Sequence, residues 1–264
     1  MTHEPPRPGI LRATPFAPAQ RRQLLVFGSP VECVLMPERA ARPGQPTAGR
    51  PAFRERVAER ILREETQWQD DAVAITANRF PFAQNQQIFW ARQPTREHDT
   101  SFLSHVFAAA DRCQGSALIN SIGAAASIAH AHAHVTDERL PFLGHLRTRS
   151  LTLGWLPQVA GVEICAAEVP FCLLAVRGSA AARAAAVYAL QLCRMTAAVN
   201  VVAQDGVSWI FPRSVVETPR PHFPFALGSA EVWGRWCYVE EAAYADASAE
   251  ALEQALCASG TAPL

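Results

Sequence analysis

The amino-acid sequence predicts an α+β fold built on an antiparallel sheet. Short apolar segments of strand length, several of them consecutive along the chain, are mixed with amphipathic helical segments over the 264 residues. Some of the short segments flank turn sequences, and Asp205-Gly206 is the strongest hairpin signal among them. Residues 129–135 alternate strictly between histidine and small apolar residues, which is the two-residue period of a strand. This mixture favours antiparallel sheet over a doubly wound parallel sheet.

The first half of the chain contains the following expected elements. Residues 1–22 are rich in proline and arginine and should form an extended arm. Two strands should flank Gly28-Ser29-Pro30, and four prolines and two glycines predict a surface loop over 37–51. Helical spacing of apolar residues predicts an amphipathic helix over 51–69. The remaining elements are strands at 24–27, 31–36, 72–76, 88–91, 117–120 and 129–135, and a helix at 100–112.

The second half repeats this order of elements loosely. It begins with three short apolar segments, continues with an alanine-rich helical segment, and then reaches the hairpin at Asp205-Gly206. The expected elements are strands at 150–155, 162–168, 171–176, 200–203, 208–211 and 230–239, and helices at 179–198 and 248–258.

The composition excludes several classes of function. The formal net charge is zero, so we expect no nucleic-acid partner, and no apolar run reaches 18 residues, so we expect no membrane span. All 24 basic residues are arginine, which excludes a Schiff-base lysine and a lysine P-loop. Phosphate recognition would therefore use arginine, backbone N–H groups, hydroxyls or histidine. The seven scattered cysteines form no CxxC pair, and together with the absence of a signal peptide they predict a reduced cytoplasmic protein.

Three histidines at alternate positions carry the chemistry. On a strand, residues two apart point to the same side, so His130, His132 and His134 should line one face. Ala131 and Ala133 should face the other side and allow close packing there. Three imidazoles are a costly filling for a core, because each ring needs a partner for at least one polar nitrogen.

Two functional readings compete with a purely structural role. In the first, the imidazoles bind a metal ion, with Asp137 or Glu138 as a carboxylate ligand. Same-face positions on one strand lie roughly 6.5–7 Å apart, so three consecutive ones converge on a single metal with difficulty. In the second, the middle imidazole attacks a phosphorus atom while its other nitrogen donates to a backbone carbonyl. We favour the second reading.

The sequence around these histidines resembles the histidine-triad superfamily of nucleotide hydrolases and transferases. The segment from Asn120 to His132 is similar to the active-site segment of GDP-hexose phosphorylases. Asn78-Arg-Phe-Pro81 is similar to the Asn-x-Phe-Pro element of diadenosine tetraphosphate phosphorylases and galactose-1-phosphate uridylyltransferases. Trp209-Ile-Phe-Pro-Arg213, followed by Gly228-Ser229, resembles elements in the second halves of those phosphorylases. The resemblance covers roughly residues 70–240.

This resemblance implies a fold and a set of site residues. The expected fold is a histidine-triad-like (HIT-like) antiparallel sheet with helices, in two pseudo-repeated halves: residues 23–145 with the histidines, and a degenerate half at 146–264. His132 would be the nucleophile that forms a nucleotidyl-histidine, and His130 would orient it or help to bind phosphate. Asn120 and Ser127 would hold either the phosphate oxygens or the geometry of the nucleophile. The other expected substrate-binding residues are Gly123 in a close turn, Asn78, Phe80 and Pro81 at the nucleoside, and Arg213 as a phosphate counter-charge.

The sequence departs from that branch at two places. The phosphorylases and transferases usually have glutamine where this chain has His134, and a third histidine belongs to the hydrolase branches. The branch commonly has a histidine after Asn-x-Phe-Pro, where this chain reads Ala83-Gln-Asn-Gln-Gln87. Both changes point to a divergent member whose acceptor differs from the usual phosphate.

The resulting functional hypothesis is a nucleotidyl-transferring enzyme, either a phosphorylase or a hydrolase. Its substrate would be a nucleoside diphosphate sugar or a dinucleoside polyphosphate. It would require no cofactor, although a metal at the histidine cluster is the alternative. A catalytically inactive nucleotide-binding protein is a further alternative. His98, His105, His145 and His222 stand alone and are expected at the surface or as satisfied core residues. The arginine-rich helix at 54–63 is expected to be a solvated face, and its guanidiniums could also reach a phosphate or the second subunit of a homodimer.

Overall fold

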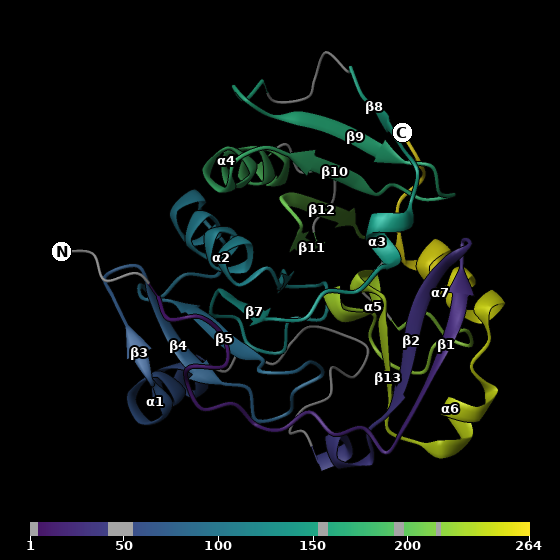
Figure 1. Cartoon of the computed structure of the whole chain (residues 1–264), viewed down its shortest axis with the longest axis horizontal. Helices are drawn as coiled ribbons and strands as arrows, with labels where there is room; N and C mark the ends of the chain where they lie inside the picture. The colour runs from purple at the N-terminus through teal and green to yellow at the C-terminus, as the bar shows by residue number, and fades with distance from the viewer. Residues whose placement is uncertain (1–4, 42–54, 153–157, 193–197, 215–217) are drawn as a thin grey trace.

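The computed structural model of the chain describes residues 5–41, 55–152, 158–192, 198–214 and 218–264. Of the described strands, ten form one large sheet, and three form a smaller sheet beside it (Figure 1). Within the described residues, all neighbouring strands of the large sheet are antiparallel. The sequence prediction of an α+β fold with antiparallel sheet is therefore confirmed.

The large sheet contains the same order of elements twice. The first set is β3 (Trp68–Gln69), β4 (Val73–Ala77), β5 (Gln87–Ala91), α2 (Thr100–Cys113), β6 (Ser116–Asn120) and β7 (His132–Thr136). The second set is β8 (Thr148–Ser150), β9 (Glu163–Ala167), β10 (Leu174–Arg177), α4 (Ala180–Leu192), β11 (Val199–Gln204) and β12 (Val207–Pro212). The spatial order is β3-β4-β5-β7-β6 in one half and, read from the other edge, β8-β9-β10-β12-β11 in the other. The two halves meet at the β6–β11 pair, which gives the sheet a pseudo-twofold arrangement.

The second half of the large sheet has no histidines at the positions equivalent to His132 and His134. Leu118 pairs with Val202 in the middle of the β6–β11 ladder. Leu118 also pairs with His134, whereas Val202 pairs with Trp209. Trp209 thus occupies the place of His134, and Val207, two residues earlier on β12, occupies that of His132. The chemistry implied by the histidines can reside in only one half.

Helices α2 and α4 lie side by side on one face of the large sheet (Figure 1). They bury one apolar core together with side chains of both halves, including Phe89, Ala131, Ala133, Val135 and Ile210. Asp99 caps α2, because its carboxylate accepts from the N–H of Phe102 at 2.8 Å. The alternation of β7 therefore directs its alanine and valine side chains toward the helices and its histidines away from them.

The opposite face packs against the smaller sheet and the C-terminal helices. Strands β1 (Gln20–Val26) and β2 (Ser29–Leu35) form a hairpin, and β13 (Arg235–Tyr238) runs parallel to β2. Aromatic side chains dominate this second core, with Trp233, Trp236, Phe171, Phe211 and Phe223 all nearly inaccessible. The helices of this layer are α3 (Phe142–His145), α5 (Ser229–Trp233), α6 (Glu241–Asp246) and α7 (Ala249–Ser259).

Several elements differ from the sequence prediction at their boundaries. The extended arm ends before Gln20, where β1 begins, and a 3₁₀ helix at Pro37–Ala41 occupies the start of the expected loop. Helix α1 covers Glu55–Glu65 of the predicted 51–69. The expected strand over 230–239 is wrong in its first part, because α5 occupies Ser229–Trp233. The rest of the loop at 42–50, the helix start at 51–54, and parts of the segments at 150–155 and 179–198 lie outside the described residues.

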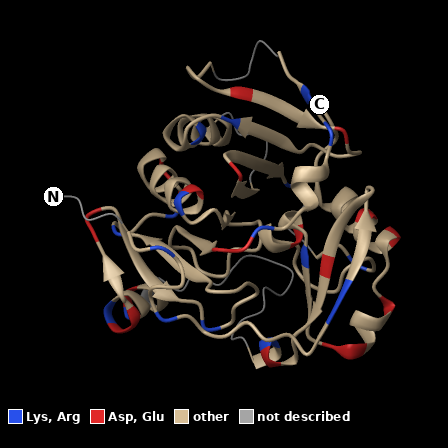
Figure 2. Cartoon of the chain, viewed as in Figure 1, with Lys and Arg blue, Asp and Glu red and all other residues tan. Residues whose placement is uncertain are grey.

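Charged residues are dispersed over the elements, with acidic residues on α6 and α7 and arginines on β1 (Figure 2). The Asp205-Gly206 hairpin has both residues at positive φ, 53° and 72°, as a type I′ turn requires. Within the described ranges, no helix combines the length and the apolar character needed to cross a membrane.

Candidate active site

The three histidines of the motif lie on the face of the sheet opposite α2 and α4. His132 and His134 belong to β7, and their rings meet edge to face at 5.7 Å between centroids. His130 precedes the strand, which begins at His132 and not at residue 129 as predicted. His132 is buried, with 6% of its surface exposed, whereas His130 and His134 are half-buried. The structure thus brings the three imidazoles together, with the middle one the most protected from water.

The hydrogen bond of the His132 ring fixes its tautomer. Its Nδ1 lies 2.8 Å from the backbone carbonyl oxygen of His130. A carbonyl oxygen only accepts, so Nδ1 carries the proton and donates. In the neutral ring the lone pair then resides on Nε2. This arrangement is the one that a nucleophilic imidazole requires.

A tryptophan on the neighbouring strand packs against these rings. Trp90 pairs with His132 across the β5–β7 ladder, and the two rings stack at 5.0 Å with an angle of 29° between their planes. The same indole meets the His130 ring edge to face at 6.0 Å. His130 donates from Nε2 to the carbonyl oxygen of Ala91 at 2.6 Å, which anchors its ring to the end of β5.

His98 supports the backbone of the central histidine. It lies directly before the cap of α2, is 4% exposed, and places Nε2 3.1 Å from the carbonyl oxygen of His132. Burial, followed by the nearby His132, lowers the pKa of His98 to about 4. The ring is therefore neutral at physiological pH, and its Nε2–H donates to His132. The sequence predicted a surface residue or a hydrogen-bonded core histidine, and His98 is the latter. The prediction did not place His98 beside the candidate active site.

The Asn-x-Phe-Pro element forms a closed loop beside the histidines. Asn78 is buried, its amide donates to Oε1 of Gln86 at 2.9 Å, and its own carbonyl oxygen accepts from the N–H of Phe80 at 3.0 Å. Gln86 Oε1 also accepts from the N–H of Phe82 at 2.8 Å. Asn78 therefore shapes the loop through its side chain.

The aromatic ring that this loop presents to the histidines is that of Phe82. It meets the His134 ring at 5.3 Å and 62°. The backbone carbonyl oxygens of Phe80 and Pro81 both accept from the guanidinium of Arg39, the latter at 3.0 Å. Pro81 is buried and Phe80 is half-buried. The predicted nucleoside-pocket residues therefore lie next to the site, with Phe82, which the prediction omitted, in contact with a histidine.

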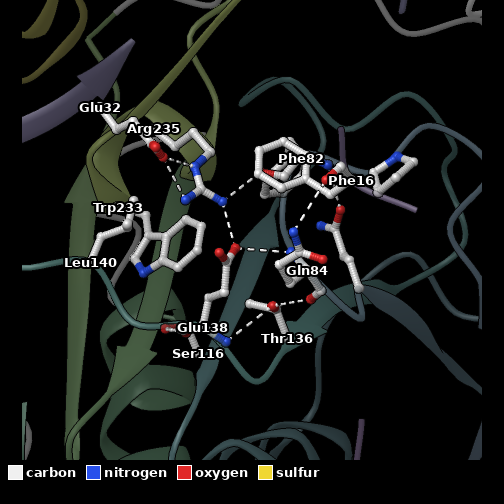
Figure 3. Close-up of polar contacts among 12 residues, drawn as sticks. Phe16, Glu32, Phe82, Gln84, Ser116, Thr136, Glu138, Leu140, Trp233 and Arg235 are labelled. Carbon is white, nitrogen blue, oxygen red and sulfur yellow. Dashed lines mark hydrogen bonds and ion pairs between the residues drawn. The ribbon is translucent and has the colours of Figure 1, made fainter. Parts of the chain in front are cut away.

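An ion-pair network holds this loop against the smaller sheet (Figure 3). Arg235 of β13 is 2% exposed and pairs with Glu32 and Glu138, each at 2.6 Å. It also donates to the carbonyl oxygen of Phe82 at 2.9 Å. Glu138 in turn accepts from the N–H of Gln84 at 2.9 Å. One guanidinium thus ties both sheets to the loop that touches His134.

The same contacts bear on the alternative of a metal site. Glu138 is engaged by Arg235 and Gln84, and Asp137 accepts from the amide of Asn85 at 2.7 Å. Neither predicted carboxylate ligand is bonded toward the histidine rings. Over the described part of the chain, no three His, Cys, Asp or Glu side chains are grouped as metal ligands.

The turn before the histidines packs against β11. Gly123 has a φ of +90°, which only glycine adopts without strain, so a side chain there would distort the turn. The carbonyl oxygen of Ala124 accepts from the amide of Asn200 at 2.8 Å. Ser127 is half-buried and lies between this turn and His130. Asn200 therefore positions the segment that leads into the site.

Asn120 is used to join elements. Its carbonyl oxygen accepts from the Asn200 amide and from the N–H of Ser229 at the start of α5, both at 2.7 Å. These bonds connect β6, β11 and α5 beside the turn that contains Gly123.

Arg213 belongs to the same buried network. Its guanidinium is 4% exposed and donates to Oδ1 of Asn200 at 3.2 Å and to the carbonyl oxygen of Leu227. Burial lowers the pKa of Arg213 to about 10 and raises that of nearby Glu231 to about 7. The side chain of Asn200 therefore lies between the guanidinium of Arg213 and the turn that contains Ala124.

Comparisons with known proteins reveal similarity in structure. No protein-family model matches the sequence, and no curated protein matches it. Yeast Ap4A phosphorylase in complex with Ap4A superposes with a TM-score of 0.67 at 15% identity, over 97% of this chain and 93% of that one. A further structure of that enzyme gives 0.66 at 14% identity, over 93% of this chain and 88% of that one.

The chain has the fold of yeast Ap4A phosphorylase. The complex of the yeast enzyme with AMP agrees, with a TM-score of 0.65 at 13% identity over 92% of this chain and 89% of that one. The predicted HIT-like fold with two pseudo-repeated halves is thereby confirmed. The division into residues 23–145 and 146–264 stays a prediction.

Proposed function

We propose that this protein transfers a nucleotidyl group through His132, acting on a nucleoside 5′-phosphoanhydride as a phosphorylase or hydrolase. The observation that carries the proposal is the hydrogen bond from His132 Nδ1 to the carbonyl of His130, which places the proton on Nδ1 and the lone pair of the neutral ring on Nε2. The likeness in fold to an enzyme solved with Ap4A and with AMP supports a dinucleoside polyphosphate as the substrate. A nucleoside diphosphate sugar is the second candidate substrate, because it contains the same phosphoanhydride bond.

The reaction has two displacements. Nε2 of His132 attacks the α-phosphorus, a new N–P bond forms, and the P–O bond to the leaving phosphate group breaks with its electron pair on oxygen. An acceptor oxygen, from phosphate or water, then attacks the same phosphorus, and the N–P bond breaks to restore neutral His132. Water must lose a proton in this step, whereas a phosphate oxygen already carries negative charge. The covalent intermediate divides one slow displacement into two faster ones.

The side chains around His132 have separate tasks in this proposal. His134 flanks the nucleophile and would donate to phosphate oxygens, whereas His130 would orient the nucleophile through its carbonyl, which accepts from Nδ1 of His132. The turn containing Gly123 and Ser127 would present backbone N–H groups and a hydroxyl to the same charge. Phe82 and the loop closed by Asn78 would border the nucleoside. No metal takes part in this sequence of steps.

Turnover of a substrate panel tests the proposal. Wild-type protein is incubated with dinucleoside polyphosphates and nucleoside diphosphate sugars, with and without inorganic phosphate, and the products are separated by chromatography. We expect the phosphoanhydride to be cleaved and the product to reveal the acceptor. His132→Asn, which lacks the nucleophile but keeps a donor, should lower kcat by at least about a thousandfold, since removing a nucleophile has effects of that order.

The matched control is His105→Asn on α2, where the histidine bonds only to the backbone of Ser101. Its activity should equal that of the wild type. If His132→Asn turns over the same substrate at the wild-type rate, or if the wild type cleaves no member of the panel, the chain is not this enzyme. Binding of nucleotides without cleavage would instead identify a nucleotide-binding protein.

A further inference from the structure

The contact between Trp90 and His132 has a geometry that suggests a specific task. The indole and the imidazole stack at 5.0 Å and 29°, so the face of the indole covers one face of the imidazole ring. Trp90 is 1% exposed and cannot swing into solvent. Its Nε1–H donates to the hydroxyl of Thr76 at 2.9 Å, which fixes the rotation of the indole plane. Thr76 itself is 1% exposed.

We propose that Trp90 is the positioning residue of His132, holding the plane of the imidazole and stabilising the positive charge that its ring acquires in the nucleotidyl-histidine. The second part rests on the proposed function. The first part, the fixed ring plane, follows from the geometry alone.

The charge arises because His132 keeps the proton on Nδ1. When Nε2 forms the N–P bond, no proton leaves the ring, so the imidazole becomes cationic while the attached phosphoryl group remains anionic. His132 is 6% exposed, and a charge buried to that extent loses most of its hydration. The carbonyl of His130 and the negative face of the indole, which attracts cations, both stabilise this charge. Among aromatic side chains, tryptophan provides the strongest such attraction.

The orientation also matters for the attack. Rotation of the imidazole about its bond to Cβ would carry the Nε2 lone pair away from the phosphorus. The bond from Nδ1 to His130 resists this rotation at one edge of the ring, and the stacked indole resists it on one face. A nucleophile held within a narrow range of angles needs less reorganisation to reach the transition state.

Three variants separate this role from ordinary packing. Trp90→Phe keeps an aromatic face and loses the bond to Thr76, and Trp90→Leu loses the aromatic face. Phe89→Leu is the matched control, because Phe89 is equally buried on the same strand but points to the helix side of the sheet. All three enlarge or loosen a core, so a purely structural role predicts similar losses for Trp90→Leu and Phe89→Leu.

The first readout is independent of activity. In NMR spectra of the free protein, the carbon-bound protons of the His132 ring should show an upfield ring-current shift, assigned by its absence in His132→Asn. We expect this shift in the wild type and Phe89→Leu, a smaller one in Trp90→Phe and none in Trp90→Leu. An unchanged position in Trp90→Leu would overturn the stacked arrangement.

The second readout uses a radiolabelled nucleotide substrate. Trp90→Leu should lower kcat and the steady-state level of labelled protein by about tenfold, the effect of roughly 1.4 kcal/mol of lost cation–π attraction, with KM nearly unchanged. Trp90→Phe should recover most of the loss. Equal effects of Trp90→Leu and Phe89→Leu would overturn the role in catalysis. A wild type that never becomes labelled would overturn the proposed function and, with it, the charge-stabilising part, while the NMR result still decides the stacking.

Discussion

At the scale of single residues, the site is built from histidines with assigned roles. His130 and His132 each donate a hydrogen bond from one ring nitrogen to a backbone carbonyl, and His98 donates one to the carbonyl of His132. Carbonyl acceptors impose the N–H form on the bonded nitrogen. The backbone around β5 and β7 thereby decides which nitrogen of His132 can attack.

His98 gives a pH-dependent prediction at this scale. Its pKa is about 4 in the folded chain, lowered from 6.5 mainly by burial. Between these values the unfolded chain binds a proton that the folded chain does not, so the free energy of unfolding falls as the pH falls from 6.5 to 4. His98→Asn keeps a donor and does not titrate. Between pH 6.5 and 4, the free energy of unfolding of this variant should therefore fall by up to about 3 kcal/mol less than that of the wild type.

Denaturant unfolding of both proteins at a series of pH values between 7 and 4 measures this difference. The aspartates and glutamates titrate in both proteins and cancel in the comparison. If the two curves run parallel over this range, His98 is not held neutral by its burial.

The residue-level chemistry was partly predictable. The alternation His-Ala-His-Ala-His was sufficient to predict that the three imidazoles share a face, since a strand has a strict two-residue period. Nothing local in the sequence identifies His98, Trp90 or Asn200, because each reaches the site through a strand or helix distant along the chain. Trp90 could have been suspected only if the pairing of the two predicted strands at 88–91 and 129–135 had been assumed in the correct register.

At the scale of elements, hydrogen bonds connect the turn before β7 to β11, β12 and α5. Asn200 bonds to Ala124 and Asn120, and Arg213 bonds to Asn200. The family resemblance suggested that Arg213 neutralises phosphate charge. Its burial and its two bonds support a role in holding Asn200 and the loop at Leu227 instead.

The two roles of Arg213 make opposite predictions for Arg213→Met. The structural role predicts a free energy of unfolding lower by about 2–4 kcal/mol, because buried acceptors lose a charged donor, and a KM within about twofold of the wild type. Denaturant unfolding and steady-state kinetics on the same preparation measure both. A stable variant whose KM rises by more than about tenfold would restore the phosphate-binding role.

Element boundaries were harder to predict than elements. The strand expected over 129–135 begins at His132, because the carbonyl of Ala131 accepts from the N–H of Ala91 while its own N–H donates to Thr95, beyond the end of β5. Helix α5 was expected to be strand, since its apolar residues do not reveal that Glu231 bonds back to the N–H of Gly228. Capping of this kind outweighs the apolar pattern over a segment of five residues.

At the scale of the whole molecule, two sheets cooperate in one site. The large sheet supplies the histidines, and the smaller sheet supplies Arg235, which bonds to Phe82 of the loop beside His134. The second half of the large sheet has Val207 and Trp209 where the first half has histidines. The duplication therefore contributes support and burial, and only the first half presents the candidate nucleophile.

The junction between the sheets yields a prediction of its own. Arg235→Met leaves the half-buried Glu32 and Glu138 without their shared buried partner, which should lower the free energy of unfolding by about 2–4 kcal/mol. The loop of Phe82 also loses a donor, so KM for the nucleotide should rise. Arg139→Met, which removes an exposed pair with Asp205, is the control and should change neither quantity. A KM equal to that of the wild type in Arg235→Met would show that this loop does not border the substrate.

The central claim is that His132 becomes covalently nucleotidylated, and mapping the labelled residue tests it most directly. The protein is mixed with substrate radiolabelled at the α-phosphate, quenched in alkali, digested, and the labelled peptide is identified by mass spectrometry. Our account predicts a label that survives alkali and is lost in acid, as expected for an N–P bond, located on His132 and absent in His132→Asn. A label on any other residue, or equal labelling of the two proteins, would contradict it.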